Sequence, residues 1–108
     1  MREIREYINE GGRSPFAEWF NGLNAQAALK VNTCLTRMGN GNLSAVKGAG
    51  SGVHECVIDW GPGYRVYLGK VGDKLIILLG GGTKKHQQKD IDRAKKLWKE
   101  YKKRKKET

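Results

Sequence analysis

The sequence has few of the residues that build metal centres and disulfide frameworks. Only two cysteines and two histidines occur in 108 residues, and neither a C-x-x-C pair nor zinc-finger spacing is present. The four side chains that arithmetic allows for a zinc site are Cys34, His54, Cys56 and His86. Because free cysteine packs like a small hydrophobe, we instead expect two buried thiols, and neither a metal nor another cofactor.

Long hydrophobic runs and nucleotide-binding glycine motifs are also missing. The longest apolar run, Leu75 to Leu79, is far too short to cross a bilayer, and the N-terminal MREIREYINE lacks the apolar stretch of a signal peptide. Neither G-x-G-x-x-G nor G-x-x-x-x-G-K-[ST] occurs. These absences predict a cytoplasmic protein without a membrane partner or a nucleotide cofactor. With 38% hydrophobic residues, the chain suffices for a single domain over residues 1–108.

Acidic residues are scarce, and the excess of positive charge lies at one end. The net charge is +10, and the stretch from Lys84 onward holds 12 Lys or Arg against 4 Asp or Glu, which leaves only +2 for residues 1–83. Such a basic segment favours a polyanionic partner, because neutralising phosphates releases counterions. A solvated basic helix, or one that binds an acidic protein, is the alternative for the final KKRKKE.

Periodicity and turn residues predict an α+β domain in the order β-α-α-β-β-β-α. Ser14-Pro15 is a typical helix start, and Asn24 can cap a second helix. The unpatterned, glycine-rich stretch 42–52 is predicted to be a loop. The expected elements are a strand within residues 2–8, helices over 15–22 and 24–39, three antiparallel strands over 53–60, 64–70 and 74–79, and a helix from about Gln87 to Tyr101, with residues 102–108 frayed. The sheet should carry the helical hairpin on one face.

Within the strands, residue alternation separates an apolar face from a face that can do chemistry. His54 is in phase with Cys56 and Ile58, whereas Arg65 and Tyr67 share the opposite type of face in the next strand. The strand over 74–79 shows no alternation, so it should be covered on both faces and form the centre of the sheet.

A cationic end of the sheet is the expected candidate site. The turn after the third strand should bring Lys84, Lys85 and His86 beside Arg65 and Tyr67. Guanidinium and ammonium groups suit phosphate, and a tyrosine can donate a hydrogen bond or stack on a base. The alternatives are an Arg65 that pairs with Asp59 or Glu55 across the hairpin, and a Tyr67 that only covers the sheet.

Three motifs resemble one family. SPFAEWFNGL, GPGYRVYLGK and GGTKKHQQKDIDRA, in this order and spacing, are similar to the addiction-module killer proteins, phage-related and HigB-like members of the RelE/ParE toxin superfamily. The resemblance covers nearly the whole chain. It implies a compact RelE-like toxin fold with a basic C-terminal helix. It also implies the toxin of a bacterial type II toxin-antitoxin system, which cleaves translated mRNA on the ribosome and is held inactive by a cognate antitoxin, here expected to be a small helix-turn-helix protein.

The resemblance also implies roles for particular residues of a metal-independent endoribonuclease. Arg65 matches the strand arginine that binds the scissile phosphate, and Lys84 matches the basic residue after the last core strand. The full set of candidates is catalytic Arg65, Lys84, Tyr67, His86 and Asp90, with RNA-binding Lys47, His54, Lys85, Lys89 and Arg93. Where many relatives read E-L-R-I, this chain has Val57 in place of the basic residue. Alternative functions are a ParE-like DNA gyrase poison and a non-catalytic nucleic-acid-binding protein.

Overall fold

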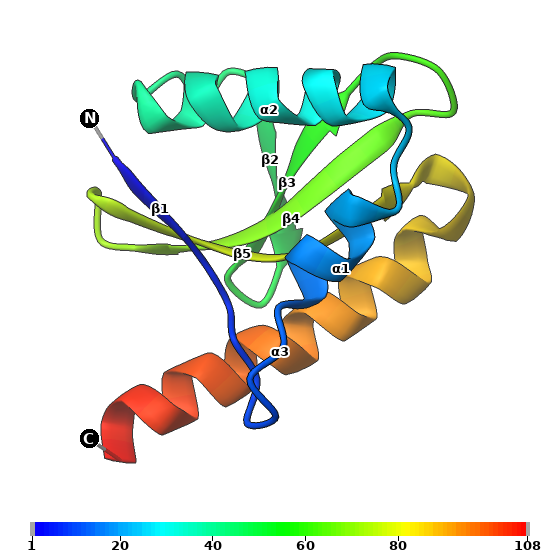
Figure 1. The fold of residues 1–108 in the computed structure, drawn as a ribbon. Coiled ribbons are helices and arrows are strands. Elements are labelled where there is room, and N and C mark those ends of the chain that lie inside the picture. The colour runs from blue at the N-terminus through cyan, green and yellow to red at the C-terminus, as the bar shows by residue number, and fades with distance from the viewer. Residues whose placement is uncertain (1, 108) are drawn as a thin grey trace.

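A five-stranded sheet with helices on both faces forms the protein. The computed structural model describes residues 2–107 (Figure 1). The elements are β1 (Glu3–Glu6), α1 (Pro15–Asn21), α2 (Ala25–Gly39), β2 (Val46–Gly50), β3 (Val53–Ile58), β4 (Tyr64–Val71), β5 (Leu75–Thr83), the 3₁₀ turn η1 (Lys84–His86) and α3 (Gln87–Glu107). This confirms the α+β class. Across residues 2–107, no helix combines the length and apolar character that a bilayer span requires.

The two short helices begin where their caps predict. The Ser14 hydroxyl accepts a hydrogen bond from the backbone N–H of Ala17, and Pro15 occupies the first turn of α1. Asn24 accepts in the same way from the N–H of Ala27 at the start of α2. Four side chains of α2 are buried against the sheet: Ala27, Val31, Cys34 and Met38.

The sheet is mixed, not wholly antiparallel as predicted. Its strand order is β1-β5-β4-β3-β2, and β1 pairs in parallel with β5 over four residues. The other three pairings are antiparallel. A parallel neighbour needs a long crossover, and here the two helices and three strands between β1 and β5 supply it.

The predicted loop over residues 42–52 contains a strand, which corrects that prediction. β2 pairs antiparallel with β3 at the sheet edge, and its register shifts between Gly48 and Gly50. Only Val46 of β2 packs on the core below α2. Because the other β2 residues are small or exposed, they show no alternation, and pairing with β3 holds this segment in the sheet.

Each face of the sheet carries its own hydrophobic cluster. One lies under α1 and α2 and includes Val66 and Leu68; the other lies under α3 and includes Tyr67 and Trp98. Figure 1 shows α2 and α3 on opposite sides of the sheet. β5 contributes to both clusters, which confirms that it is covered on both faces. The central strand, however, is β4, because β1 flanks β5 on its other side.

The C-terminal helix is longer than predicted, since α3 continues to Glu107 instead of fraying after Tyr101. The Arg104 guanidinium lies over the Tyr7 ring and donates a 2.8 Å hydrogen bond to the Ile8 carbonyl. Lys102 lies over Trp98 in the same way. These cation–π contacts extend the helix beyond its apolar stripe. The predicted tail residue 108 lies outside the described residues.

Both cysteines are buried, as predicted. Cys34 of α2 and Cys56 of β3 belong to the same core cluster, and the structure pairs their sulfur atoms with the Cα atoms 7.2 Å apart. The prediction of two free thiols is therefore wrong, because the structure has Cys34 and Cys56 as a disulfide. Most disulfides hold their Cα atoms about 4.4–6.8 Å apart, so this separation is longer than usual.

Candidate functional site

Arg65 and Lys84 lie next to each other at the end of the sheet where the prediction placed them. A Cβ built on Gly63 would be 3.4 Å from the Cβ of Lys84 and 3.8 Å from Nη1 of Arg65. The backbone N–H of Lys84 donates to the Gly63 carbonyl at 2.8 Å, which fixes the turn after β5 against the start of β4. Lys84 is exposed. Gly63 therefore lies between the Cβ of Lys84 and the guanidinium of Arg65, and its lack of a side chain keeps this space open.

Arg65 is held by Glu55. Its Nε donates to Oε1 of Glu55 at 3.1 Å, and the two side chains are 12% and 7% exposed. Gln87, in the first turn of α3, donates from Nε2 to the same carboxylate at 2.9 Å. The predicted alternative of an Arg65 that pairs with an acid across the hairpin is thus confirmed, and the acid is Glu55, not Asp59. Val57 lies directly across from Arg65 in the β3–β4 register and is half-buried, so no positive charge stands at that position.

Tyr67 is buried at the centre of this face. Only 1% of the residue is exposed, and its hydroxyl has no hydrogen-bond partner among the described residues. Burial, followed by the negative charges of Glu55 and Asp90, raises the pKa of Tyr67 to about 12. The phenol therefore remains a proton donor at neutral pH. A base cannot stack on its ring without rearrangement, so the interpretation of Tyr67 as a stacking surface does not hold in this conformation.

Asp90 reaches from α3 to the backbone of β5. A Cβ built on Gly82 would collide with its carboxylate, so only glycine fits at that position. Burial raises the pKa of Asp90, partly offset by the positive charges of His86, Arg93 and Lys89. The glycines after the apolar part of β5 thus serve close packing: Gly81 lies against the Trp19 ring on the opposite face in the same way.

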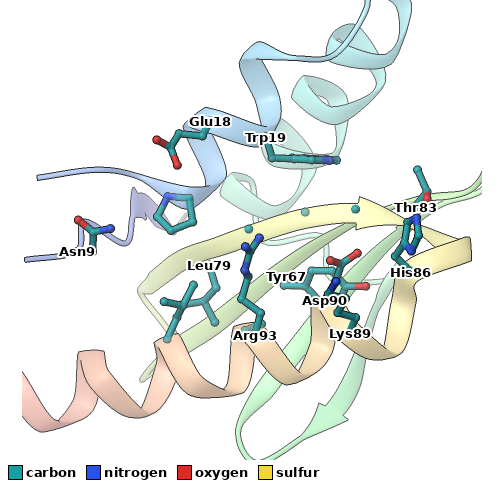
Figure 2. A pocket seen from close by; sticks show the side chains of 16 residues that line it. Asn9, Glu18, Trp19, Tyr67, Leu79, Thr83, His86, Lys89, Asp90 and Arg93 are labelled. Carbon is teal, nitrogen blue, oxygen red and sulfur yellow. The ribbon is translucent and has the colours of Figure 1, made fainter. Parts of the chain in front are cut away.

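A groove of about 900 Å³ runs along the end of β5 between α1 and α3. Figure 2 shows Trp19 on one side of the strand and Arg93, Asp90 and His86 on the other. Tyr67 lies between Arg93 and Asp90. The triple glycine forms part of its wall. The groove therefore joins three of the predicted catalytic residues, Tyr67, His86 and Asp90, on one surface.

The predicted RNA-binding residues are spread more widely. Lys89 and Arg93 line the groove, and Lys85 is exposed in η1. Lys47 is exposed on β2, opposite Glu55 in the register, and so lies on the α3 face at the far edge. His54 lies on the other face, in phase with Cys56; burial and then the charge of Lys70 lower its pKa. His54 is thus separated from the other candidates.

Three residues of the site were not predicted as site residues: Trp19, Gln87 and Glu55. Gln87 stands three positions after Lys84, which places it one turn along, and a polar residue at the start of a buried helix face is a usable signal. Glu55 lies on the same face of β3 as Val57, the residue across from Arg65, and the sequence indicated it only as one of two possible ion-pair partners. Trp19 could not be distinguished from a core aromatic.

Chemically, the site offers phosphate ligands and proton carriers at neighbouring positions. Lys84 presents an exposed ammonium group beside the partly neutralised Arg65. His86 is exposed at the mouth of the groove and is the residue type whose ordinary pKa lies near neutrality. Residues 2–107 hold no group of three or more His, Cys, Asp or Glu arranged for a metal ion.

Comparison with known proteins places the chain among bacterial relatives. No protein-family model matches it. A protein of Haemophilus influenzae, described as an uncharacterized protein, is 43% identical to it over 83 residues, which cover 76% of this chain and 84% of that protein. The chain belongs to the same family as that protein.

Proposed function

We propose that the protein is the toxin of a type II toxin-antitoxin system, a RelE/ParE-like, metal-independent endoribonuclease that cleaves mRNA on the ribosome. The single observation that carries the proposal is the position of Lys84 and Arg65 next to Gly63, beside a groove that holds His86 and Asp90. Two cations at one end of a strand pair suit a phosphodiester. The net charge of +10 favours association with ribosomal RNA and mRNA.

In the proposed reaction, the 2′-hydroxyl oxygen of a ribose attacks the adjacent phosphorus. The bond from phosphorus to the 5′-oxygen breaks, and a 2′,3′-cyclic phosphate and a free 5′-hydroxyl result. A base must take the 2′ proton, and an acid must protonate the leaving oxygen. His86 is the exposed group suited to one of these transfers, and Lys84 stabilises the charge on the phosphoryl oxygens. Asp90, which lines the same groove as His86, is the acidic member of the proposed set.

Arg65 contributes less charge than an unpaired guanidinium, because Glu55 neutralises it. The ribosome compensates in this proposal: it holds the mRNA, and orienting reactants can supply several kcal/mol of the barrier. Arg65 then mainly fixes the position of the phosphate through the N–H groups that Glu55 does not use. The modest catalytic set is consistent with an enzyme that depends on the ribosome.

The topology gives the proposal further support. The resemblance implies one strand, two helices, antiparallel strands and then a basic helix, and the protein has these elements with β2 as an addition. The partners that follow from the proposal are the ribosome, mRNA and an antitoxin, expected to be a small helix-turn-helix protein. A gene for such a protein beside this one is the genomic arrangement that the proposal predicts.

Growth arrest on induced expression tests this function. We expect the wild type to stop growth and the double variant Arg65→Ala, Lys84→Ala to restore it. The matched control is Arg37→Ala, Lys74→Ala, which removes one Arg and one Lys elsewhere and should remain toxic. Full toxicity of the Arg65, Lys84 variant would refute the residue assignment. Broken DNA with intact mRNA would instead indicate a ParE-like gyrase poison.

A second candidate is a nucleic-acid-binding protein without nuclease activity. The Glu55–Arg65 pair and the position of Val57 beside it favour this function, because both reduce the free positive charge at the phosphate site. Binding to single-stranded RNA would then fall steeply with salt and leave the RNA intact. Filter binding at increasing salt, with the RNA recovered and sized afterwards, separates the two candidates.

A further inference from the structure

The last five residues of β5 form a free strand edge. β1 follows β5 only to Leu78, whose carbonyl accepts a 2.9 Å hydrogen bond from the N–H of Tyr7. The chain then turns away through residues 9–13 and enters α1. From residue 79 to residue 83, β5 therefore has β4 on one side and no strand on the other within the described chain.

The register identifies the backbone groups that are left over. Lys84 donates to the Gly63 carbonyl, so this pair is of the hydrogen-bonded type. Such pairs alternate in an antiparallel ladder. Gly82 and Gly80 then bond to β4, whereas Gly81 and Thr83 direct both N–H and C=O away from it. The Thr83 carbonyl caps η1, where it accepts the first hydrogen bond of the 3₁₀ turn. Within residues 2–107, the groups that no strand takes up are therefore the N–H and C=O of Gly81 and the N–H of Thr83.

The walls of the groove suit a strand in the plane of the sheet. On the α1 side, Pro15 and Trp19 line the groove; on the α3 side, Ala94 and Leu97 do. Side chains of an added strand would alternate between these two apolar walls, as those of β5 do. In addition, the buried Tyr67 hydroxyl, which lacks a partner, lies in this groove (Figure 2). Stacked bases could contact Trp19 but would leave the backbone groups of the strand edge unused.

We propose that an extended, acidic segment of a partner protein adds to the β5 edge as a sixth strand, bonding to the backbone of Gly81 and Thr83 between α1 and α3. Strand addition of this kind is a general mode of peptide recognition. Within residues 2–107, the β5 edge is unpaired at this end, where a glycine run allows close approach of another backbone. The inference does not depend on RNA cleavage and goes beyond the proposed nuclease.

The charges of the groove select an acidic occupant. Lys89 and Arg93 are exposed on the α3 rim. Of the two acids that line the groove, Glu18 already pairs with Arg13 at 3.2 Å, and Asp90 lies against β5. A carboxylate of the added strand that faces α3 can pair with the exposed Arg93. A second copy of this chain is disfavoured, because each copy carries a net charge of +10.

A displayed library of random ten-residue segments, selected on the purified wild-type protein, tests this proposal. We expect enrichment of segments in which acidic and apolar residues alternate. A synthetic peptide of the enriched sequence should slow amide exchange at Gly81 and Thr83, measured by NMR. Its affinity should fall about tenfold or more on Arg93→Glu, which corresponds to roughly 1.4 kcal/mol. Lys96→Glu, an equal charge change on the outer face of α3, should leave the affinity unchanged.

Methylation of alternate backbone nitrogens of the peptide removes the strand hydrogen bonds without touching the protein, and it should abolish binding. Equal binding of the methylated peptide would overturn the proposal, as would enrichment of no segment. Protection of Gly81 and Thr83 in the protein alone, rising with its concentration, would assign the edge to a second copy. Protection by a ten-nucleotide RNA but by no peptide would assign it to nucleic acid. Peptide binding by the Arg65→Ala, Lys84→Ala variant separates this result from the nuclease proposal.

Discussion

Replacing Tyr67 by phenylalanine should make the free protein more stable. The hydroxyl is buried and has no partner among the described residues, and its pKa, raised to about 12, reflects that burial. Leaving a buried polar group unpaired costs about 1–3 kcal/mol. Phenylalanine keeps the ring in the cluster below α3 and removes only this group. We therefore expect a gain of about 1 kcal/mol, equivalent to a rise of roughly 4 °C in Tm for a domain of this size.

Urea denaturation followed by tryptophan fluorescence measures this gain. Tyr64→Phe is the matched control. Tyr64 also lies on β4 and stacks on Trp60, but its hydroxyl is not one of the buried groups that lack a hydrogen-bond partner. The control should change the free energy of unfolding by less than about 0.5 kcal/mol. If the Tyr67 hydroxyl instead has a hydrogen-bond partner in solution, Tyr67→Phe will destabilise the protein. A decrease of about 1 kcal/mol or more in the free energy of unfolding would show that the hydroxyl is not unpaired.

The remaining predictions concern three other positions. Glu55→Gln should cost about 3 kcal/mol in urea denaturation, because it leaves the nearly buried Arg65 charge uncompensated; no loss would mean that water screens the pair. Gly69→Ala should cost about 1–3 kcal/mol, since its Cβ would collide with Trp98, whereas Gly48→Ala, which meets open space, should be neutral. Because the folded protein lowers the pKa of His54, the unfolded chain binds more protons there, and the protein loses stability as the pH falls from the ordinary histidine pKa to the lower folded value. His54→Gln should therefore reduce the loss of unfolding free energy on the acid side of neutrality. Wild-type and variant profiles that run parallel would contradict this.

Much of the fold could be predicted from local signals. Ser14 and Asn24 mark their helices by side-chain caps, which act within three residues. The alternation in β3 and β4 placed Cys56 and Val66 on one face and Arg65 and Tyr67 on the other, because successive strand residues point to opposite faces. Alternation did not predict that α3 also covers this second face. The unalternating β5 was recognised as covered on both faces for the same reason. Caps act between neighbouring residues, and burial sets the hydrophobic periodicity, so both can be read from the sequence.

The rest depends on contacts between distant segments. β2 exists because β3 offers it an edge, and its glycines show no strand pattern. The parallel pairing of β1 with β5 joins the two ends of the chain, and strand direction leaves no mark on composition. The last turns of α3 are held by the aromatic rings of Tyr7, Trp98 and Tyr101 under its cations.

The candidate site shows the same division. The neighbouring positions of Arg65 and Lys84 follow from hairpin geometry, so the sequence predicted them. Which acid pairs with Arg65 depends on the register of β3 against β4, and both Asp59 and Glu55 were open. The groove could not be predicted, because it arises where β1 stops short of the end of β5 and α3 crosses below.

Primer extension on an mRNA translated by purified ribosomes shows whether the protein cleaves mRNA on the ribosome. We expect the wild-type protein to produce new 5′ ends within the translated region, and these ends should be missing without ribosomes. The Arg65→Ala, Lys84→Ala variant should abolish them, whereas Arg37→Ala, Lys74→Ala should not. An mRNA that stays intact in the presence of wild-type protein and active ribosomes would contradict the proposed function.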